Sequence, residues 1–284
     1  MFGNVNEDSF DAVFDTVIIA NGARSELRPK SWVKIDKLYP WGAKWTIVPE
    51  CLAFETQILH QFYDRSHTML GILPTGAIPA EPNKRLSSIF WSLPTDQLGN
   101  FLENNQARSN WLKEVSKRWK PAAEWLEQVI AHPEEKQQWL SAHYRDVVMS
   151  KFGEGRMGVI GYAAHAMSPQ LGQGANMALL DAWALGQAVA ASRNNESIEH
   201  AKLWQAYHQH RQSSTAFYQF LSRLLTPLYQ SDLWWAGGLR DLSSSWMYRI
   251  PYLRNEMAIT VSGLKSGIFS QMKYEDIAQR HEHE

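Results

Sequence analysis

The glycines of one short segment could form a cradle for an anion or a polar ring. Residues 157–182 read MGVIGYAAHAMSPQLGQGANMALLDA, where Gly161 ends an apolar run and Pro169, Gly172 and Gly174 follow in a loop. The loop precedes a helical pattern, and the first turn of a helix has N–H groups without intrahelical partners at the positive end of the helix dipole. Glycines at this point let another molecule approach the backbone closely. The alternative is that Gly172 and Gly174 only shape a tight loop, and the residues alone favour neither interpretation.

Two elements must position these glycines. Residues 157–160 form a short apolar run that predicts a buried strand. Residues 174–192 predict a helix, because apolar residues recur at i, i+3 and i+4 spacing. These residues are Met177, Leu180, Ala184, Leu185 and Ala188. A further strand is expected at residues 14–20, which end at the turn signal Asn21-Gly22.

Residues 157–182 resemble the second FAD-binding motif of the flavoprotein aromatic hydroxylases. This family of FAD-dependent aromatic-ring monooxygenases includes para-hydroxybenzoate, phenol and ubiquinone-biosynthesis hydroxylases. Its motif is a strand ending in Gly-Asp, then Ala-Ala-His, a Pro, and Gly-x-Gly-x-Asn leading into a helix. The matching residues are Gly161, Ala163, Ala164, His165, Pro169, Gly172, Gly174 and Asn176.

The resemblance implies that the start of the helix contacts the cofactor through backbone N–H groups near the flavin ring and pyrophosphate. These groups would belong to Gly172, Gly174, Ala175 and Asn176. Tyr162 stands where the family has an Asp that binds hydroxyl groups of FAD. A phenol is bulkier and uncharged, although it can still form a hydrogen bond, so we expect weaker FAD binding.

Residues 14–28, FDTVIIANGARSELR, resemble the Asp-Gly motif of the same family. Asn21 stands where Asp is usual, while Gly22, Ser25 and Arg28 match. The resemblance implies that this stretch, with Asn21, Gly22 and Arg24 as contacts, lies near the flavin pyrophosphate and the NAD(P)H path. The alternative is an ordinary strand-to-turn connection with solvated arginines. The loss of both carboxylates, to Asn21 and Tyr162, also fits relaxed constraint in a remnant gene product.

The expected fold is α/β. A partial FAD-binding Rossmann-like domain takes residues 1–38 and 144–195, and a mixed β-sheet substrate-binding domain, residues 39–143, is inserted into it. Residues 196–284 form a carboxy-terminal helical region. No Gly-x-Gly-x-x-Gly follows a strand, so we expect a truncated chain that lacks the amino-terminal nucleotide-binding unit of the family.

Within the inserted domain, strands are expected at residues 69–73 and 88–93, and from Leu52 to Phe62 by their shared parity. A helical region is expected at 95–140, broken at Pro121 and Pro133. The aromatic residues there are candidates for a pocket lining, although core packing is the simpler interpretation for each. They are Trp41, Trp45, Phe54, Phe90 and Trp91.

Bulk composition narrows the functional classes. Lys and Arg number 28 against 29 Asp and Glu, a net charge of -1, so we expect no nucleic-acid partner. The single cysteine, Cys51, forms no internal disulfide, which favours a cytoplasmic location. No run reaches the ~18 apolar residues of a transmembrane segment. The apolar stretch 216–235 is interpreted as helical core rather than a surface for a membrane or a partner.

The resemblance implies an FAD-dependent monooxygenase. NADH or NADPH would be the reductant, and one oxygen atom of O2 would enter a small aromatic or hydrophobic substrate. Because the flavin carries this chemistry, we expect cofactor contacts rather than a catalytic side chain or a metal site. The competing interpretation is a non-catalytic remnant, or one half of a split flavoprotein that needs an amino-terminal partner chain. A homo-oligomer also remains open.

Overall fold

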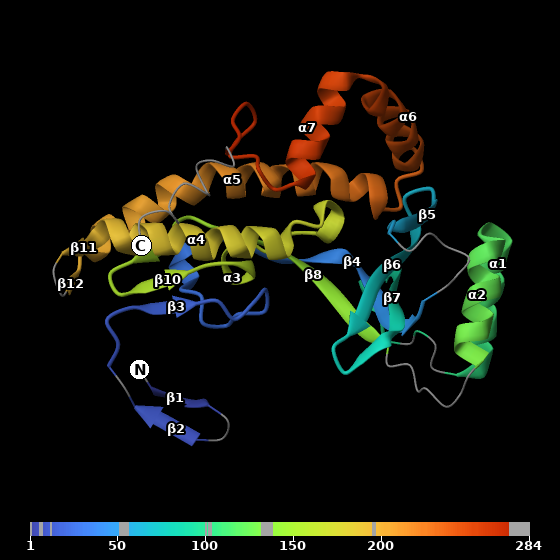
Figure 1. Ribbon diagram of the computed structural model, residues 1–284, viewed down its shortest axis with the longest axis horizontal. Helices are drawn as coiled ribbons and strands as arrows, with labels where there is room; N and C mark the ends of the chain where they lie inside the picture. The colour runs from blue at the N-terminus through green and yellow to red at the C-terminus, as the bar shows by residue number, and fades with distance from the viewer. Residues whose placement is uncertain are drawn as a thin grey trace. The chain divides into compact units, whose positions relative to one another are not determined.

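The computed structural model describes residues 2–5, 8–11, 13–50, 57–99, 101, 104–131, 139–194 and 197–272 (Figure 1). It has the α/β architecture expected from the sequence. The chain divides into two compact units, each built from separate stretches. The first unit comprises Met1–Lys37, Arg145–Arg223 and Tyr248–Glu284, and the second comprises Leu38–Tyr144 and Leu224–Met247.

A small sheet in the first unit brings together strands that are far apart in the sequence. Strand β3 (Val17–Ile19) pairs in parallel with β10 (Met157–Val159), and β10 pairs antiparallel with β9 (Gly153–Glu154). Because β3 and β10 run in parallel, the residues that follow them lie at the same edge of the sheet. Two antiparallel hairpins complete the strands: β1 (Phe2–Val5) with β2 (Asp8–Asp11), and β11 (Arg193–Asn194) with β12 (Ser197–Ile198).

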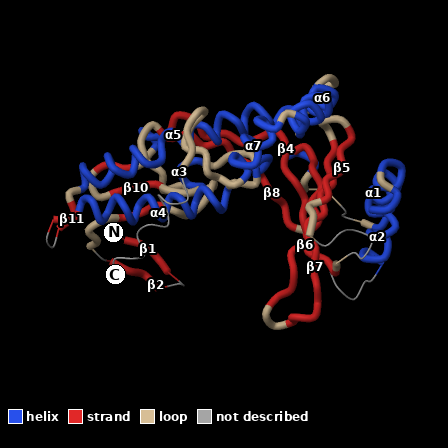
Figure 2. Tube along the Cα trace, turned by 45° about the horizontal axis from the view of Figure 1, so that its top comes forward, coloured by secondary structure: helices blue, strands red, loops and turns tan. Residues whose placement is uncertain are grey.

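Helices of very different length follow β10. The predicted helix is confirmed as α4 (Gly174–Ser192), and α5 (His200–Tyr229) runs beside it in both ribbon views (Figures 1 and 2). The remaining helical elements of this unit are η1 (Lys30–Trp32), α3 (Tyr162–His165), η3 (Pro169–Leu171) and α7 (Pro251–Val261).

Helix α5 packs on the small sheet through one large side chain. Trp204 is buried and donates its indole N–H to the Gly155 carbonyl at 2.8 Å. A Cβ added at Gly153 or Gly158 would lie 2.1 or 2.0 Å from the Trp204 ring. Only glycine therefore lets the indole rest directly on β9 and β10. The surrounding core of this unit includes Ile19, Val147, Val159, Ala184 and Leu203.

The second unit is a five-stranded sheet with a helix pair. Its strand order is β5-β6-β7-β4-β8, and β5–β6, β6–β7 and β7–β4 are antiparallel. The strands are β4 (Val33–Pro49), β5 (His60–Asp64), β6 (Thr68–Ile78), β7 (Glu81–Pro94) and β8 (Leu140–Met149). The helices are η2 (Thr95–Gln97), α1 (Asn105–Arg118), α2 (Lys120–Ala131) and α6 (Ala236–Arg249).

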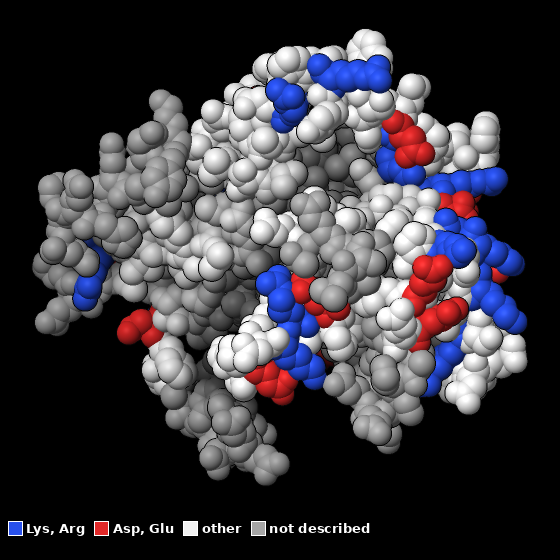
Figure 3. Space-filling model, turned by 45° about the vertical axis from the view of Figure 1, so that its right-hand side comes forward, with Lys and Arg blue, Asp and Glu red and all other residues white. Residues whose placement is uncertain are grey.

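The core of the second unit lies between its sheet and the α1–α2 pair. Ile72, Ile89 and Trp91 of the sheet share one buried cluster with Val115 and Leu126 of the helices. Strands β6 and β7 contain the two expected strands at 69–73 and 88–93. The charged side chains of this unit are largely intermixed, and on the face in Figure 3 the basic groups lie among acidic ones. Arg118, for example, binds both Asp64 and Glu114 at 2.6 Å.

The expected break at Pro121 is confirmed, because α1 ends at Arg118 and Pro121 lies in the first turn of α2, where its missing N–H group has no partner to lose. Two other sequence expectations need correction. Ile58 lies outside any strand and is 45% exposed, so the expected strand is not continuous through Ile58, and the strand that contains Phe62 begins at His60. Residues 51–56 and 132–138, which include Phe54 and Pro133, lie outside the described residues.

The second correction concerns the apolar stretch 216–235. Phe220 and Leu224 are 58% and 56% exposed, so these side chains do not form helical core. Phe217 and Tyr218 of this stretch do pack in a core cluster, but polar side chains of α5 are buried as well, because they bind carbonyl groups of the first unit. Ser214 donates to Lys265 O and Ser222 to Ser168 O, at 3.0 and 3.1 Å. In the part of the chain that the structure describes, no helix is long and apolar enough to cross a membrane.

Candidate functional site

The two sequence motifs meet at one edge of the small sheet. Ile19 of β3 pairs with Val159 of β10, and the Ile160 N–H donates to the Ile19 carbonyl at 3.0 Å. The next residues on each strand are therefore neighbours, which places the Asn21-Gly22 turn beside Gly161. Ligands of α/β proteins bind outside the carboxyl ends of parallel strands.

Gly161 turns the chain sharply at the end of β10. Its φ and ψ of 60° and -148° lie in a region that is essentially restricted to glycine. Its N–H donates to Asp181 Oδ2 of α4 at 2.6 Å, which fixes the strand end to the helix. Tyr162 directly follows and begins α3, so its backbone position is set by this contact.

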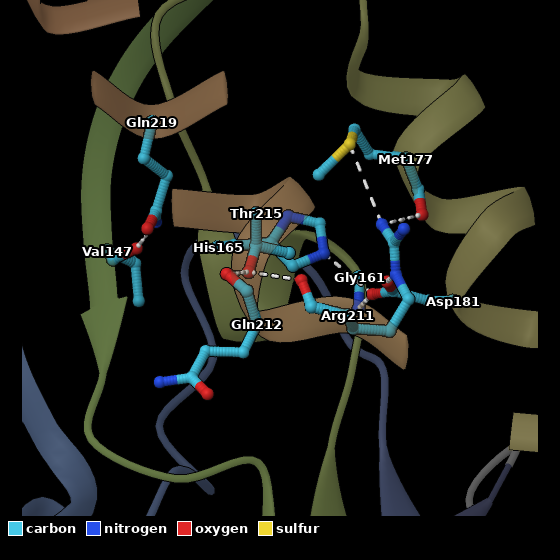
Figure 4. A network of polar contacts seen from close by, with 9 residues as sticks. All are labelled: Val147, Gly161, His165, Met177, Asp181, Arg211, Gln212, Thr215 and Gln219. Carbon is cyan, nitrogen blue, oxygen red and sulfur yellow. Dashed lines mark hydrogen bonds and ion pairs between the residues drawn. The ribbon is translucent and has the colours of Figure 1, made fainter. Parts of the chain in front are cut away.

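Asp181 is the centre of a buried polar network (Figure 4). Besides Gly161, its Oδ2 lies 2.6 Å from His165 Nε2, and its Oδ1 accepts from Arg211 Nε of α5 at 2.6 Å. Both carboxylate oxygens are thus bonded, although the side chain is 0% exposed. Burial by itself raises the pKa of Asp181, but His165, Arg211 and the Gly161 amide together lower it to about 2. His165 thus helps to hold the buried Asp181 carboxylate.

The loop before α4 leaves space beside its backbone. Pro169 opens η3, and the Gly172 N–H donates to the Pro169 carbonyl at 2.9 Å. Gly172 has φ +64°, the left-handed region, and a Cβ added there would meet no atom within 4 Å. The exposed backbone at Gly172 therefore borders open space rather than another part of the protein.

At the start of α4 the polar side chains form hydrogen bonds to the end of α7, whereas no side chain caps the backbone N–H groups. No side chain caps the helix at Gln173, whose amide instead donates to the Val261 carbonyl. The Asn176 amide donates to Gln173 Oε1 at 2.9 Å and to the Ser262 carbonyl at 3.3 Å. The Asn176 side chain is thus turned toward the end of α7. The backbone N–H groups of Gly174, Ala175 and Asn176, in the first turn, have no acceptor within the helix.

Tyr162 lies against the first residue of α4. A Cβ added at Gly174 would be 2.2 Å from the Tyr162 hydroxyl oxygen and 2.6 Å from its Cζ. The side chain is half-buried, and burial raises the pKa of its phenol above the ordinary value. A neutral ring therefore borders the uncapped first turn.

The turn after β3 places its polar groups at the surface. Asn21 and Arg24 are exposed, and Gly22 has φ +87°. The buried Arg28 links this turn to the other motif, because its Nη1 donates to the carbonyls of Ala23 and Ala163, both at 3.1 Å. Arg28 also pairs with Asp36 at 2.8 Å. The sequence marked Arg28 only as a motif match, without this linking contact.

Aromatic side chains that were candidates for a pocket lining pack against other residues of the second unit. Trp91 is buried and packs edge-on against Trp111, with ring centroids 5.6 Å apart. Trp41 is buried against His67, and the Phe90 ring covers Gly71. Core packing, the simpler interpretation, therefore describes Trp41 and Trp91. Trp45 is partly buried.

Two site residues were missed at the level of the sequence, Asp181 and Arg211. A signal for Asp181 was present, since it lies in register with the apolar face of α4 formed by Met177, Ala184 and Ala188. A carboxylate on an apolar face requires buried partners. Nothing in the sequence marks Arg211 as that partner, because it lies 30 positions away on another helix.

Comparison with known proteins agrees with this geometry. Residues 17–217 match the model of the FAD binding domain family, and the chain therefore belongs to that family. No curated protein sequence matches the chain. FAD is accordingly the cofactor that the family implies for this fold.

Several solved structures share the fold. HpxO of Klebsiella pneumoniae, solved with FAD and uric acid, superposes with a TM-score of 0.63 and 19% identity, covering 93% of this chain and 62% of that one. A 2-methyl-3-hydroxypyridine-5-carboxylic acid oxygenase gives 0.60 and 20%, with 89% and 60% covered. The tetracycline destructase Tet(51) gives 0.59 and 16%, with 94% and 65% covered. The chain thus spans less than two thirds of the length of these proteins.

The backbone at the start of α4 fits a bound polar ring or phosphate. Gly172 borders open space, the first turn is uncapped, and the helix dipole is positive there. These features suit a flavin. The Tyr162 side chain occupies part of the space beside Gly174 at this helix start.

Proposed function

We propose that this chain forms the flavin-contacting part of an FAD-dependent monooxygenase. The observation that carries the proposal is the parallel pairing of β3 and β10, which brings Asn21-Gly22 and Gly161 to one edge before the uncapped start of α4. We assign the cofactor contacts to Gly161, Pro169, Gly172, Gly174, Ala175 and Asn176, with Asn21, Gly22 and Arg24 beside them, and Tyr162 bordering the same site.

The chain's own groups would bind and orient the cofactor. First-turn N–H groups of α4 donate to it, and Gly172 lets it approach the backbone. Bound flavin supplies the redox chemistry, with NADH or NADPH as reductant, O2 as oxidant and a small aromatic or hydrophobic molecule as the hydroxylated substrate. The Asp181 network keeps the strand end and the helix start in fixed register, which a preorganised site requires.

Titration with FAD tests the proposal directly. We expect quenching of flavin fluorescence on binding, and flavin absorbance retained after desalting. NADH or NADPH oxidation in the presence of aromatic compounds would then test the substrate class. A chain that binds no flavin would instead support the remnant, or the half of a split protein that needs an amino-terminal partner.

A matched pair of glycine variants tests the location of the site. Gly172→Ala and Gly155→Ala both place a Cβ in open space at a left-handed residue, with φ +64° and +54°. The strain is therefore similar, about 1 kcal/mol in each. We expect only Gly172→Ala to weaken FAD binding, because Gly155 lies in the turn between β9 and β10. Equal affinity in the two variants would place the flavin elsewhere.

A further inference from the structure

The side chain of Tyr162 reaches from the end of β10 to the start of α4. The Gly174 Cα faces the phenol so closely that an added Cβ would lie 2.2, 2.6 and 2.9 Å from its hydroxyl oxygen, Cζ and Cε1. Real Cβ atoms do not approach other atoms at the shortest of these distances. The phenol therefore fills the space in which a side chain at position 174, or a ligand on that face of the first turn, would lie.

The backbone of Tyr162 is fixed while its side chain is not. Gly161 is held by Asp181, and the α3 backbone by hydrogen bonds from the N–H groups of Ala164 and His165 to the Gly161 carbonyl. The Tyr162 ring is 38% exposed, and among the described residues no hydrogen bond or aromatic pairing holds it. Rotation about χ1 would therefore change none of the backbone hydrogen bonds that hold the strand end.

The opposite side of the helix start cannot move in the same way. Gln173 and Asn176 are bonded to the carbonyls of Val261 and Ser262 at the end of α7. Gly263 lies directly against the Asn176 amide, where an added Cβ would overlap it at 1.5 Å. Of these three described side chains at the first turn of α4, Tyr162 is the one that no hydrogen bond holds.

We propose that Tyr162 is a gate on the flavin site, an internal occupant that must rotate away before the cofactor reaches the first turn of α4. The inference rests on the proposed flavin function and adds a regulating residue to it. The closed position of the ring lowers apparent affinity, because only the fraction of molecules with the ring outside can bind. The ring, rather than the hydroxyl group, is the blocking element.

Affinity for FAD in two variants tests the gate. We expect Tyr162→Ala to bind FAD at least about fivefold more tightly than the natural chain, since the closed fraction disappears. Tyr162→Phe keeps the ring and should bind within about twofold of the natural chain. If the natural chain binds FAD and Tyr162→Ala binds equally or more weakly, the gate is wrong while the flavin function stands. If no form binds FAD, the proposed function fails and the gate with it.

A second experiment needs no flavin. Gly174→Ala pushes the phenol out of its partly buried position, so we expect it to lower the thermal unfolding midpoint when Tyr162 is present. In the Tyr162→Ala background the same change should leave the midpoint unchanged or raise it. Gly186→Ala, in the middle of α4 with no atom within 4 Å of its Cβ, is the matched control and should act equally in both backgrounds. Equal effects of Gly174→Ala in the two backgrounds would show that the ring does not occupy this position.

Discussion

A single carboxylate joins the strand end, a short helix and a distant arginine in the first unit. Asp181 is fully buried, and Arg211, whose side chain is 2% exposed, is paired with it. A buried ion pair contributes little net stability by comparison with an apolar pair, but removal of one partner leaves an uncompensated charge. The contribution of Asp181 to the free energy of unfolding is therefore measured only in a variant that lacks its carboxylate.

Neutralising this carboxylate should strongly destabilise the fold. We expect Asp181→Asn to lower the free energy of unfolding by about 3 to 5 kcal/mol, because Arg211 keeps its charge without a counter-ion. Denaturant titration measures the loss. Asp241→Asn is the control, since Asp241 is 70% exposed and pairs with Arg240 at 2.8 Å, and it should cost less than about 1 kcal/mol. Similar losses in both variants would contradict the role given to Asp181.

Acid should release part of the same stabilisation. The pKa of Asp181 is about 2 in the folded chain, below the value of about 3.9 for an unfolded Asp. The stability that it contributes is therefore complete above about pH 4 and is lost as the pH falls toward 2. We expect the difference in unfolding free energy between the natural chain and Asp181→Asn to shrink by about 2 kcal/mol over this interval. A difference that stays constant between pH 4 and 2 would argue against it.

At the scale of elements, the contact between α5 and the small sheet depends on two glycines, which have no side chain. The Trp204 indole rests on Gly153 and Gly158, so neither position has room for a methyl group. We expect Gly158→Ala to cost about 1 to 3 kcal/mol, because the added carbon would lie 2.0 Å from the ring.

The control for this prediction is a glycine with free space around it. Gly186→Ala in α4 should stabilise the chain by up to about 1 kcal/mol, since alanine is the better helix former. Thermal unfolding of both variants gives the comparison. A harmless Gly158→Ala would mean that Trp204 does not rest on β10.

The sequence predicts an element well when apolar packing stabilises it, and poorly when hydrogen bonds to distant residues do so. The bounds of α4 were predicted because its apolar residues repeat along one face. The polar part of the buried face of α5 was not, since Ser214, Gln219 and Ser222 bury polar groups that bind carbonyls elsewhere. Periodicity counts apolar residues and cannot identify a polar face whose partners lie far along the chain. The contact between Tyr162 and Gly174 was hidden for the same reason, although both residues were predicted site members.

At the scale of the whole molecule, the second unit carries an apolar stripe that the described chain leaves uncovered. Trp235, Leu239, Leu242 and Trp246 follow one another at i, i+4, i+7 and i+11 at the start of and along α6, and are 44%, 48%, 67% and 66% exposed. Leu242 and Trp246 are mostly exposed, so these two side chains should add little to the stability of the monomer.

Substitutions in the stripe should therefore be nearly neutral. We expect Leu242→Ser and Trp246→Ser to change the unfolding free energy by no more than about 0.5 kcal/mol. Leu126→Ala, in the core of the same unit with 0% exposure, should cost about 2 to 5 kcal/mol. Denaturant unfolding of the three variants compares them. A loss at Trp246 as large as that at Leu126 would show that the stripe is covered.

The bond between Gln173 and Val261 has a consequence for the order in which the protein matures. The two residues are 88 positions apart. Translation therefore delivers the whole of α4 well before the carbonyls of Val261 and Ser262 emerge, and contacts between distant positions form later than local helix. A nascent chain that has reached only residue 250 would contain all of α4, but Gln173 and Asn176 would still lack their hydrogen-bond acceptors in residues 261 and 262. The loop assigned to the flavin is thus shaped late in synthesis, when α7 docks, and cofactor loading would follow that event.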